Sequence, residues 1–311
     1  MVAADRFIYP KKTREIRTAI NDSTRWNGFK FRDDDIIIAT WAKSGTTWMQ
    51  QIVSQVLSQG NQGVSGPVES PWLDLRGTPI SVVLERLESQ RHRRFIKTHL
   101  PVDALGIQES VKYIYVGRDP RDVAWSMHNH QSNFTDQAIT ALNGGQDCIG
   151  PALSRPPCDV REYYLQWLET GDMPGNPMPS YWENVRSWWN VRHLPNVLLV
   201  HFNNLKSDLR FEAERISRFL GAEVPDKAWP AILCHCSFDY MRAEADKLEA
   251  LKAHFRDGAR VFVNKGTNGR WKDILSAAEV ARCDVVASEQ LAADCARWLV
   301  RGARRTPPAT R

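Results

Sequence analysis

The chain has 311 residues, with 41 Lys and Arg against 36 Asp and Glu, which gives a formal net charge of +5. Four arginines lie in residues 301–311, which contain no acidic residue, so residues 1–300 carry a net charge of only +1 (37 basic minus 36 acidic). A nearly neutral body argues against a broad nucleic-acid-binding face. We therefore predict one domain over residues 1–300, followed by a basic, disordered tail over 301–311.

The composition also excludes a membrane protein and a disulfide-rich secreted protein. No apolar run approaches the roughly 20 residues of a membrane-spanning helix, and the N-terminal stretch MVAADRFIYPKK lacks the apolar segment of a signal peptide. Six cysteines are too sparse for a disulfide framework. We predict a cytoplasmic protein without membrane association. The cluster CHC at 234–236 lacks a second ligand pair at zinc spacing, so we also expect no metal.

Three strand-then-helix units follow one another along the chain. Apolar runs predict strands at 35–40, 112–116 and 196–202, and helical spacing of apolar residues predicts helices at 46–59 and 207–220. Strands that alternate with helices are typical of an α/β fold. We therefore expect a single P-loop-like domain, with a mostly parallel central sheet and helices on both faces.

Two segments rich in glycine and proline, 144–157 and 171–180, predict loops. They lie in the part of the chain after the second strand, and ligands of open α/β sheets bind outside the carboxyl ends of strands. The sequence leaves two interpretations open, a mobile lid or a plain surface excursion.

The turn between the first strand and its helix, TWAKSGTTW at 40–48, has the chemistry of an anion cradle. Backbone N–H groups at a helix N-terminus are unpaired and point at an incoming anion. Gly45 permits close approach of the backbone, and Lys43 adds a full charge. The side chains that add hydroxyl donors are Ser44, Thr46 and Thr47.

The order of residues in this turn separates it from the loop of nucleotide hydrolases. That loop reads G-x-x-x-x-G-K-[ST], whereas Lys43 precedes Gly45 and no Gly-Lys pair occurs in the chain. The string KSGTTW at 43–48 instead resembles the 5′-phosphosulfate loop of cytosolic-type sulfotransferases, although Trp41-Ala42 stands where those proteins usually have Tyr-Pro. They use 3′-phosphoadenosine 5′-phosphosulfate (PAPS) as the sulfonate donor. The resemblance implies that Trp48 stacks on adenine.

A second segment, RFIKTHLP at 94–101, is extended and basic. Residues i and i+2 of a strand face the same side, so Lys97 and His99 are expected to face one cleft. Histidine is suited to accept a proton near neutral pH. The segment resembles the part of the family that supplies the catalytic base, which implies that His99 is the base and that Lys97 is a donor near the transferred group.

A third segment, VGRDPRDVAWS at 116–126, joins the second strand to a helix. Arg118 stands at the strand end, where a planar guanidinium can hold a phosphate through two N–H bonds. Ser126 lies seven residues after the expected helix cap Asp119, on nearly the same face of the helix. The string is similar to the 3′-phosphate segment of the family, which implies that Arg118 and Ser126 bind the donor.

A fourth segment, FVNKGTNGRWK at 262–272, resembles the basic loop that closes over the nucleotide in this family. The matching donor-binding positions are Asn264, Lys265 and Gly266, but Asn264 replaces an arginine, and a bidentate arginine is not replaced conservatively. Arg270 replaces the usual acid. The sequence leaves open whether Arg270 compensates for Asn264 or whether donor affinity is lower.

Weaker matches concern single positions. Phe202 stands where a tyrosine is usual, and Cys236 stands in place of a threonine beside the nucleotide. Trp72 lies in a segment that resembles part of the acceptor pocket, together with His130, which replaces a phenylalanine, and with His99.

The resemblance implies a PAPS-dependent sulfotransferase that acts on a phenolic or alcoholic small molecule by in-line transfer and yields 3′-phosphoadenosine 5′-phosphate (PAP), without a metal. Lys43 is expected near the leaving oxygen. The alternative from the sequence is a P-loop phosphotransferase, a kinase of a small molecule; a protein that binds a nucleotide or a sulfated ligand without chemistry is a third. The sequence leaves the oligomeric state open.

Overall fold

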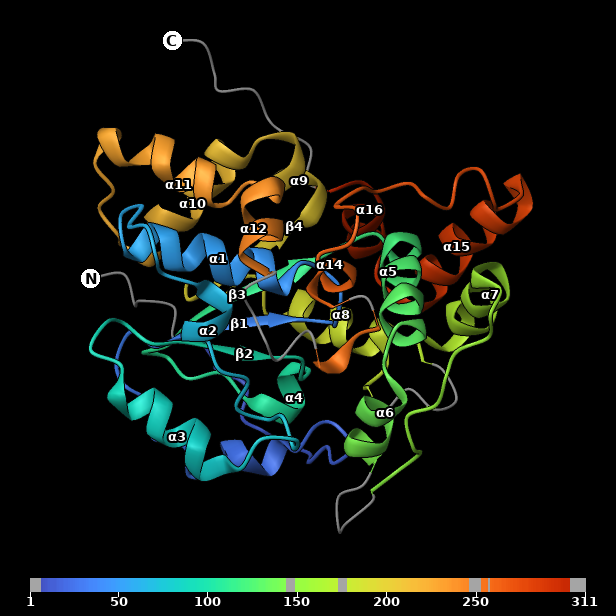
Figure 1. The fold of residues 1–311 in the computed structure, drawn as a ribbon, viewed down its shortest axis with the longest axis horizontal. Coiled ribbons are helices and arrows are strands. Elements are labelled where there is room, and N and C mark those ends of the chain that lie inside the picture. Colours follow the sequence, from blue (N-terminus) through green and yellow to red (C-terminus); the bar gives the residue numbers. More distant parts are fainter. Residues whose placement is uncertain (1–6, 144–148, 173–177, 246–252, 257, 303–311) are drawn as a thin grey trace.

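The computed structural model describes residues 7–143, 149–172, 178–245, 253–256 and 258–302, apart from the side chains of 259 and 260. The core is a sheet with helices on both faces (Figure 1). Residues 303–311 of the predicted tail and parts of both predicted loops lie outside the described residues.

The described sheet has four strands, all parallel, in the order β2-β1-β3-β4. The strands are β1 (Ile36–Thr40), β2 (Phe95–Thr98), β3 (Lys112–Gly117) and β4 (Val197–His201). Register pairs Ala39 with Thr98, Thr40 with Val116, and Gly117 with His201. Because the strands run in one direction, the residues that follow them converge on one edge of the sheet.

Both faces of the sheet are buried, as the unbroken apolar runs predict. On one face Ile36 and Ile38 of β1 pack in a cluster with α1 (Thr46–Leu57) and α10 (Leu209–Leu220). On the other face Ile37 and Ala39 pack in a cluster with α3 (Ile80–Ser89) and α8 (Tyr181–Asn190). In Figure 1, α1, α10 and α11 lie above the sheet and α3 and α4 lie below it. The predicted fold class is confirmed.

A third apolar cluster joins α5, α7, α8, α15 and α16 beside the sheet. Several tryptophans pack in this cluster, and Trp41, Trp167 and Trp182 are fully buried. Trp188 of α8 stacks on Tyr115 of the sheet, with ring centroids 5.4 Å apart.

The helices connect and cover these layers. Their bounds are η1 Ser23–Trp26, α1 Thr46–Leu57, α2 Gly66–Glu69, α3 Ile80–Ser89, α4 Val102–Leu105, α5 Pro120–Ser132, α6 Asp136–Asn143, α7 Val160–Thr170, α8 Tyr181–Asn190, α9 Phe202–Ser207, α10 Leu209–Leu220, η2 Asp226–Ala228, α11 Trp229–His235, α12 Phe238–Ala245, α14 Ala259–Phe262, α15 Ala277–Gln290 and α16 Ala293–Arg301.

The predicted boundaries shift at the third unit. Phe202, predicted as the end of a strand, opens the short helix α9, and the helix predicted from residue 207 begins at Leu209. The Asp208 side chain accepts a hydrogen bond from the Phe211 N–H and so caps α10. The Asp208 cap thus separates α9 from α10, whereas the apolar spacing alone predicted one helix from residue 207.

Candidate functional site

The sequence-predicted anion cradle lies at the carboxyl edge of the sheet, between β1 and α1. Gly45 has φ +112°, a left-handed conformation, and a Cβ atom there would lie 2.7 Å from the Phe202 ring. Only glycine fits this close approach without strain. The hydroxyls of Thr40 and Thr46 lie 2.6 Å apart and tie the strand end to the first residue of α1.

Lys43 also has a left-handed backbone, with φ +65°. Its Nζ lies 3.4 Å from His130 Nδ1 and 4.6 Å from the centroid of the Phe262 ring. Burial and the positive charges of Arg118, Lys97 and Arg270 lower the pKa of Lys43 to about 7. Among the described residues no acid is found to act on this amine, which is therefore suited to meet an anionic ligand.

His99 follows β2 and is almost fully buried. Its Nδ1 lies 2.8 Å from the Thr40 carbonyl oxygen. A carbonyl can only accept, so Nδ1 carries the hydrogen and donates it, and Nε2 of the neutral ring keeps its lone pair. Burial, with a further contribution from Lys97, lowers the pKa of His99 well below 6.5. His99 is thus a neutral imidazole with a free basic nitrogen near pH 7.

Trp72 joins His99 and Lys97. Its ring makes an edge-to-face contact with His99, with centroids 4.7 Å apart, and Lys97 Nζ lies 4.2 Å from its ring centroid. The Trp72 indole N–H donates to buried Asp74 at 2.9 Å. Burial lowers the pKa of Lys97 to about 8, against the opposing effect of the Asp74 charge. Lys97 and His99 thus lie beside one another, as the strand spacing predicted.

Two residues that the sequence did not single out hold the backbone of His99. Asn184 of α8 donates to the His99 carbonyl oxygen at 2.9 Å, and Tyr115 of β3 donates to Asn184 at 3.0 Å. Neither position carries a local motif, because the contact joins segments 85 residues apart. Thr40, the partner of His99 Nδ1, was visible only as the end of a strand.

Arg118 follows β3. Together with Lys43, Lys97 and Arg270 it forms a group of basic side chains, the charged cluster. It donates to the Lys43 carbonyl oxygen at 2.9 Å and to the Asn268 side chain at 2.8 Å, and its guanidinium lies 4.2 Å from the Phe202 ring centroid. Its Nε atom is buried without a hydrogen-bond partner among the described residues. Burial lowers the pKa of Arg118 to about 10. An unpartnered guanidinium nitrogen of this kind suits a phosphate oxygen.

Ser126 lies on α5, which begins just after Arg118, and is half-buried. His130 follows it by four residues, which places the two on the same face of the helix. The Asp119 side chain caps α5 and also binds Arg121 through two hydrogen bonds, of 2.6 and 2.9 Å. Asp119 and Arg121 therefore stabilise the start of α5.

The glycine-containing basic loop at 264–272 is anchored over the start of α5. The Gly269 N–H donates to Asp122 at 2.7 Å, and Gly266 accepts a hydrogen bond from Lys206 of α9. Arg270 lies close enough that its charge lowers the pKa of both Arg118 and Lys43. Asn264 is half-buried and Lys265 is exposed. The loop thus brings Arg270, rather than Lys265, into the charged cluster.

Trp48, Phe202 and Cys236 form one contiguous patch. The Trp48 indole N–H donates to the Cys236 carbonyl oxygen at 2.9 Å, and its ring meets Phe202 edge to face with centroids 5.3 Å apart. Burial raises the pKa of the Cys236 thiol far above its ordinary range. The thiol is therefore inert, and Cys236 acts here through its backbone.

His130 lies in a small aromatic cluster beside Lys43. Its ring contacts Phe134, Phe255 and Phe262 at centroid distances of 4.8 to 6.0 Å. Phe134 and Phe255 stack on one another at 5.2 Å and pair as a single antiparallel β-bridge. These phenylalanines form an apolar wall next to the charged cluster, and the sequence did not identify Phe134 or Phe255.

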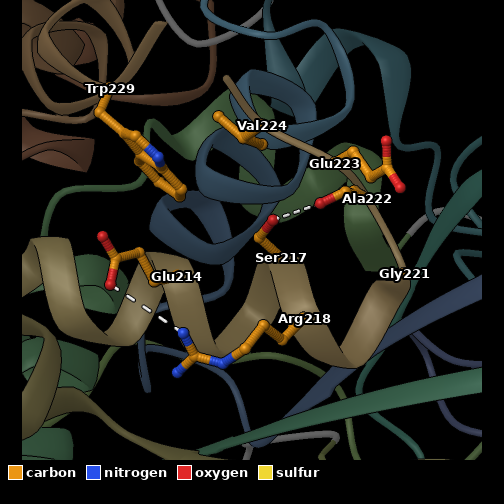
Figure 2. Close-up of a pocket in the computed structure, with 8 residues that line it drawn as sticks. All are labelled: Glu214, Ser217, Arg218, Gly221, Ala222, Glu223, Val224 and Trp229. Atoms are coloured by element: carbon orange, nitrogen blue, oxygen red, sulfur yellow. Dashed lines mark hydrogen bonds and ion pairs between the residues drawn. The ribbon is translucent and has the colours of Figure 1, made fainter. Parts of the chain in front are cut away.

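The described residues also line a groove away from this cluster and a smaller cavity next to it. A groove of about 410 Å³ lies at the end of α10 (Figure 2). In this groove Ser217 donates to the Ala222 carbonyl oxygen, and Arg218 lies 4.0 Å from Glu214. None of the sequence-predicted site residues lines it. A smaller cavity of about 30 Å³ adjoins the anion cradle at Thr47 and Phe262.

The ranges that the structure describes contain neither a metal-binding cluster nor a membrane-spanning helix. Within these ranges no group of three or more His, Cys, Asp or Glu side chains is arranged to hold a metal ion. In the same part of the chain, no helix combines the length and apolar character needed to cross a bilayer.

Comparison with known proteins agrees with this geometry. The family model of the sulfotransferase domain matches residues 33–294. A glycolipid sulfotransferase of Mycobacterium bovis is 31% identical over 98% of this chain and 97% of its own. Sulfotransferase 1B1 of Canis lupus familiaris is 28% identical over 89% and 90% of the two chains.

A solved structure is similar over the whole domain. The mouse sulfotransferase SULT7A1, crystallised with PAP, superimposes with a TM-score of 0.67 at 25% identity and covers 89% of this chain and 92% of its own. The alternative of a P-loop phosphotransferase finds no support in these matches. The family model covers most of the chain, and the protein therefore belongs to the sulfotransferase family.

Proposed function

We propose that this protein transfers a sulfonate group from PAPS to a hydroxyl of a small phenolic or alcoholic acceptor, with His99 as the general base. The observation that carries the proposal is the 2.8 Å contact between His99 Nδ1 and the Thr40 carbonyl oxygen, which is shorter than the 3.2 Å contact with the Thr40 hydroxyl and assigns the ring hydrogen to Nδ1. The Nε2 lone pair of His99 is left beside the cationic side chains of Lys97 and Lys43, which both act on its pKa. A proton acceptor near cationic side chains suits attack by a hydroxyl on an anionic donor.

The residues of the cluster fit the charge of the proposed donor. Arg118, Lys97 and Arg270 all act electrostatically on Lys43, and Arg270 also acts on Arg118. The opposing acids are Asp122 for both arginines, Asp119 for Arg118 and Asp74 for Lys97. A surplus of buried cations costs free energy unless an anion joins them. PAPS, with its phosphates and sulfate, is such an anion, and the PAP complex of the mouse relative is consistent with this choice.

The chemistry is assigned residue by residue. The donor supplies the sulfonate group, and its spent form is PAP. His99 Nε2 takes the proton of the acceptor hydroxyl as its oxygen forms the new bond to sulfur. Lys43 stabilises the negative charge on the oxygen that leaves sulfur, and Lys97 lies near the transferred group. A preorganised cation at the point where charge develops needs no reorganisation during the step.

The remaining donor contacts follow from the same cluster. We assign the phosphosulfate to the cradle at 43–47 and the adenine ring to Trp48, Phe202 and the Cys236 backbone. Arg118 and Ser126 take the 3′-phosphate, with the loop at 264–266 beside them. We further assign to Arg270 the guanidinium that Asn264 lacks, because Arg270 is close enough to Arg118 to lower its pKa.

The acceptor is assigned to the region between Trp72, His99 and His130. Its apolar walls are the Trp72 ring and the phenylalanines that contact His130. Aromatic walls with a few polar groups suit a small hydroxyl compound, and the relatives in Mycobacterium bovis and dog are named for sulfonate transfer. The predicted cytoplasmic location and the absence of a nucleic-acid partner stay predictions.

The test is a turnover assay with ³⁵S-labelled PAPS and a panel of phenols, aliphatic alcohols and saccharides. We expect label to move to at least one acceptor and PAP to accumulate in equal amount, with and without EDTA. Binding of PAP without turnover on any acceptor, by a folded protein, would favour the interpretation as a nucleotide-binding protein without chemistry.

A further inference from the structure

We propose that His130 is a positioning residue for Lys43: in the donor-free enzyme its Nδ1 accepts a hydrogen from the Lys43 ammonium, and donor binding breaks this contact. The inference rests on the proposed function, because it concerns the lysine assigned to the donor. It also assigns to His130 the tautomer opposite to that of His99.

The geometry of Lys43 carries the proposal. Its Nζ lies 3.4 Å from His130 Nδ1 and 4.6 Å from the Phe262 ring centroid. An ammonium group has three donors and no acceptor, so the imidazole nitrogen it meets must present a lone pair. In a neutral ring the hydrogen then resides on Nε2. The aromatic face of Phe262 adds a second attraction for the same cation.

The charges around Lys43 explain why a neutral partner matters. The charged groups that act on it are Arg118, Lys97 and Arg270, and all three are cations. The groups that act on His130 are Lys43, Lys97 and His99. Burial first, and then the charges of these neighbours, lower the pKa of His130 well below 6.5, so His130 remains a neutral acceptor. The imidazole therefore holds the lysine without adding to the repulsion.

The contact also links the donor side to the acceptor side. Lys43 belongs to the anion cradle, whereas the His130 ring contacts Phe134 and Phe255 of the apolar wall. When the ammonium turns toward a bound PAPS molecule, His130 Nδ1 loses its hydrogen-bond donor. Its lone pair then becomes available to another group, such as the hydroxyl of the sulfonate acceptor. His130 thereby gives the acceptor region a polar group that is released only after the donor binds.

The two site histidines make this testable by NMR of the full chain labelled with ¹⁵N in its eight histidines. Long-range correlations between ring protons and nitrogens read the tautomer of each ring, and His99→Gln and His130→Gln assign the signals. We expect a neutral Nδ1–H ring for His99 and a neutral Nε2–H ring for His130. A His130 ring protonated on Nδ1 in the donor-free protein would overturn the proposal.

Two perturbations test the link to Lys43. Both PAP addition and Lys43→Met remove the ammonium from His130, so each is expected to shift His130 Nδ1 in the same direction, toward the value of a nitrogen without a hydrogen bond. His128 is the matched control on the same helix, because its Nε2 donates to the Pro157 carbonyl oxygen at 2.8 Å, away from Lys43. The nitrogen signals of His128 are expected to remain unchanged.

The outcomes separate this inference from the proposed function. If PAP binds, as calorimetry reports independently, but neither PAP nor Lys43→Met moves the His130 Nδ1 signal, the positioning role is wrong and the proposed function stands. If PAP does not bind while Lys43→Met still shifts His130, the contact is real and the proposed donor is wrong.

Discussion

The ring of His99 is bound to the last residue of the neighbouring strand: His99 Nδ1 lies 2.8 Å from the carbonyl oxygen of Thr40. Register brings the ends of β1 and β2 together, and the hydrogen bond fixes the ring so that Nε2 keeps its lone pair. Thr40 also contacts Thr46 of the anion cradle at 2.6 Å. Thr40 thus contacts both the proposed base, His99, and the loop proposed to bind the donor.

Replacing His99 with alanine is expected to reduce turnover by roughly 10²- to 10⁴-fold, because a general base typically contributes that much. The affinity for PAP is expected to change little, since the proposed donor contacts of Arg118 and Ser126 remain. Turnover of labelled PAPS and calorimetry with PAP measure the two quantities. Near-normal turnover in His99→Ala would contradict the assignment of His99 as the general base. His128→Ala is the control variant.

PAP affinity is expected to fall as pH rises. The amine of Lys43 has a pKa of about 7 and that of Lys97 about 8 in the donor-free protein. Each binds an anion as an ammonium, so deprotonation above these values removes attraction, and the PAP dissociation constant rises by up to about tenfold per pH unit for each group.

The matched variant for this pH dependence is Lys43→Arg, because a guanidinium stays charged at every pH of the titration. Its dissociation constant is expected to rise less steeply between pH 7 and pH 9 than that of the wild type. Equal slopes for the two proteins would contradict the assignment of the lower pKa to Lys43. Titrations at matched ionic strength exclude general screening.

Arg270→Ala is expected to weaken PAP binding by roughly 10- to 100-fold, as loss of a charge-assisted hydrogen bond does, and to weaken AMP binding far less. The difference between PAP and AMP isolates the 3′-phosphate. Arg282→Ala, which removes an exposed arginine paired with Glu169, controls for net charge. If Arg270→Ala weakened both ligands equally, the 3′-phosphate assignment would fail.

Gly45→Ala is expected to destabilise the fold and to abolish PAP binding. Its φ of +112° strains any other residue, at a cost of about 1–3 kcal/mol, and the new Cβ would meet Phe202 at 2.7 Å. Gly28→Ala is the control, because Gly28 also has a positive φ but faces open space. Urea denaturation and calorimetry compare the two; equal loss of stability with PAP binding retained in both would contradict the account of the cradle.

The strand–turn–helix pattern predicted the fold class because the apolar runs at 36–40 and 112–117 face helices on both sides. It missed the short helix α9 and placed the start of α10 at about residue 207 instead of Leu209, where the Asp208 side chain caps the helix. Periodicity locates apolar faces well, but caps that divide a helix depend on single side chains.

The candidate site was predictable where its residues directly follow strands, as His99 and Arg118 do. The residues that orient the site side chains could not be predicted from the sequence. Asn184 reaches His99 from a helix 85 residues away, and Phe255 reaches His130 from a distant segment. Such contacts arise from packing between elements, which no local spacing records. The sequence also left the role of Arg270 open, because proximity of its charge to Arg118 depends on how the loop at 264–272 is folded.

The most direct test of the account is calorimetry of the purified chain with PAP, AMP and ATP–Mg²⁺, repeated with Arg118→Ala. We predict tight binding of PAP, much weaker binding of AMP, and a loss of the difference between them in the variant, because the guanidinium of Arg118 is assigned to the 3′-phosphate. Binding of ATP–Mg²⁺ in preference to PAP, with no dependence on the 3′-phosphate, would contradict the proposed sulfonate donor.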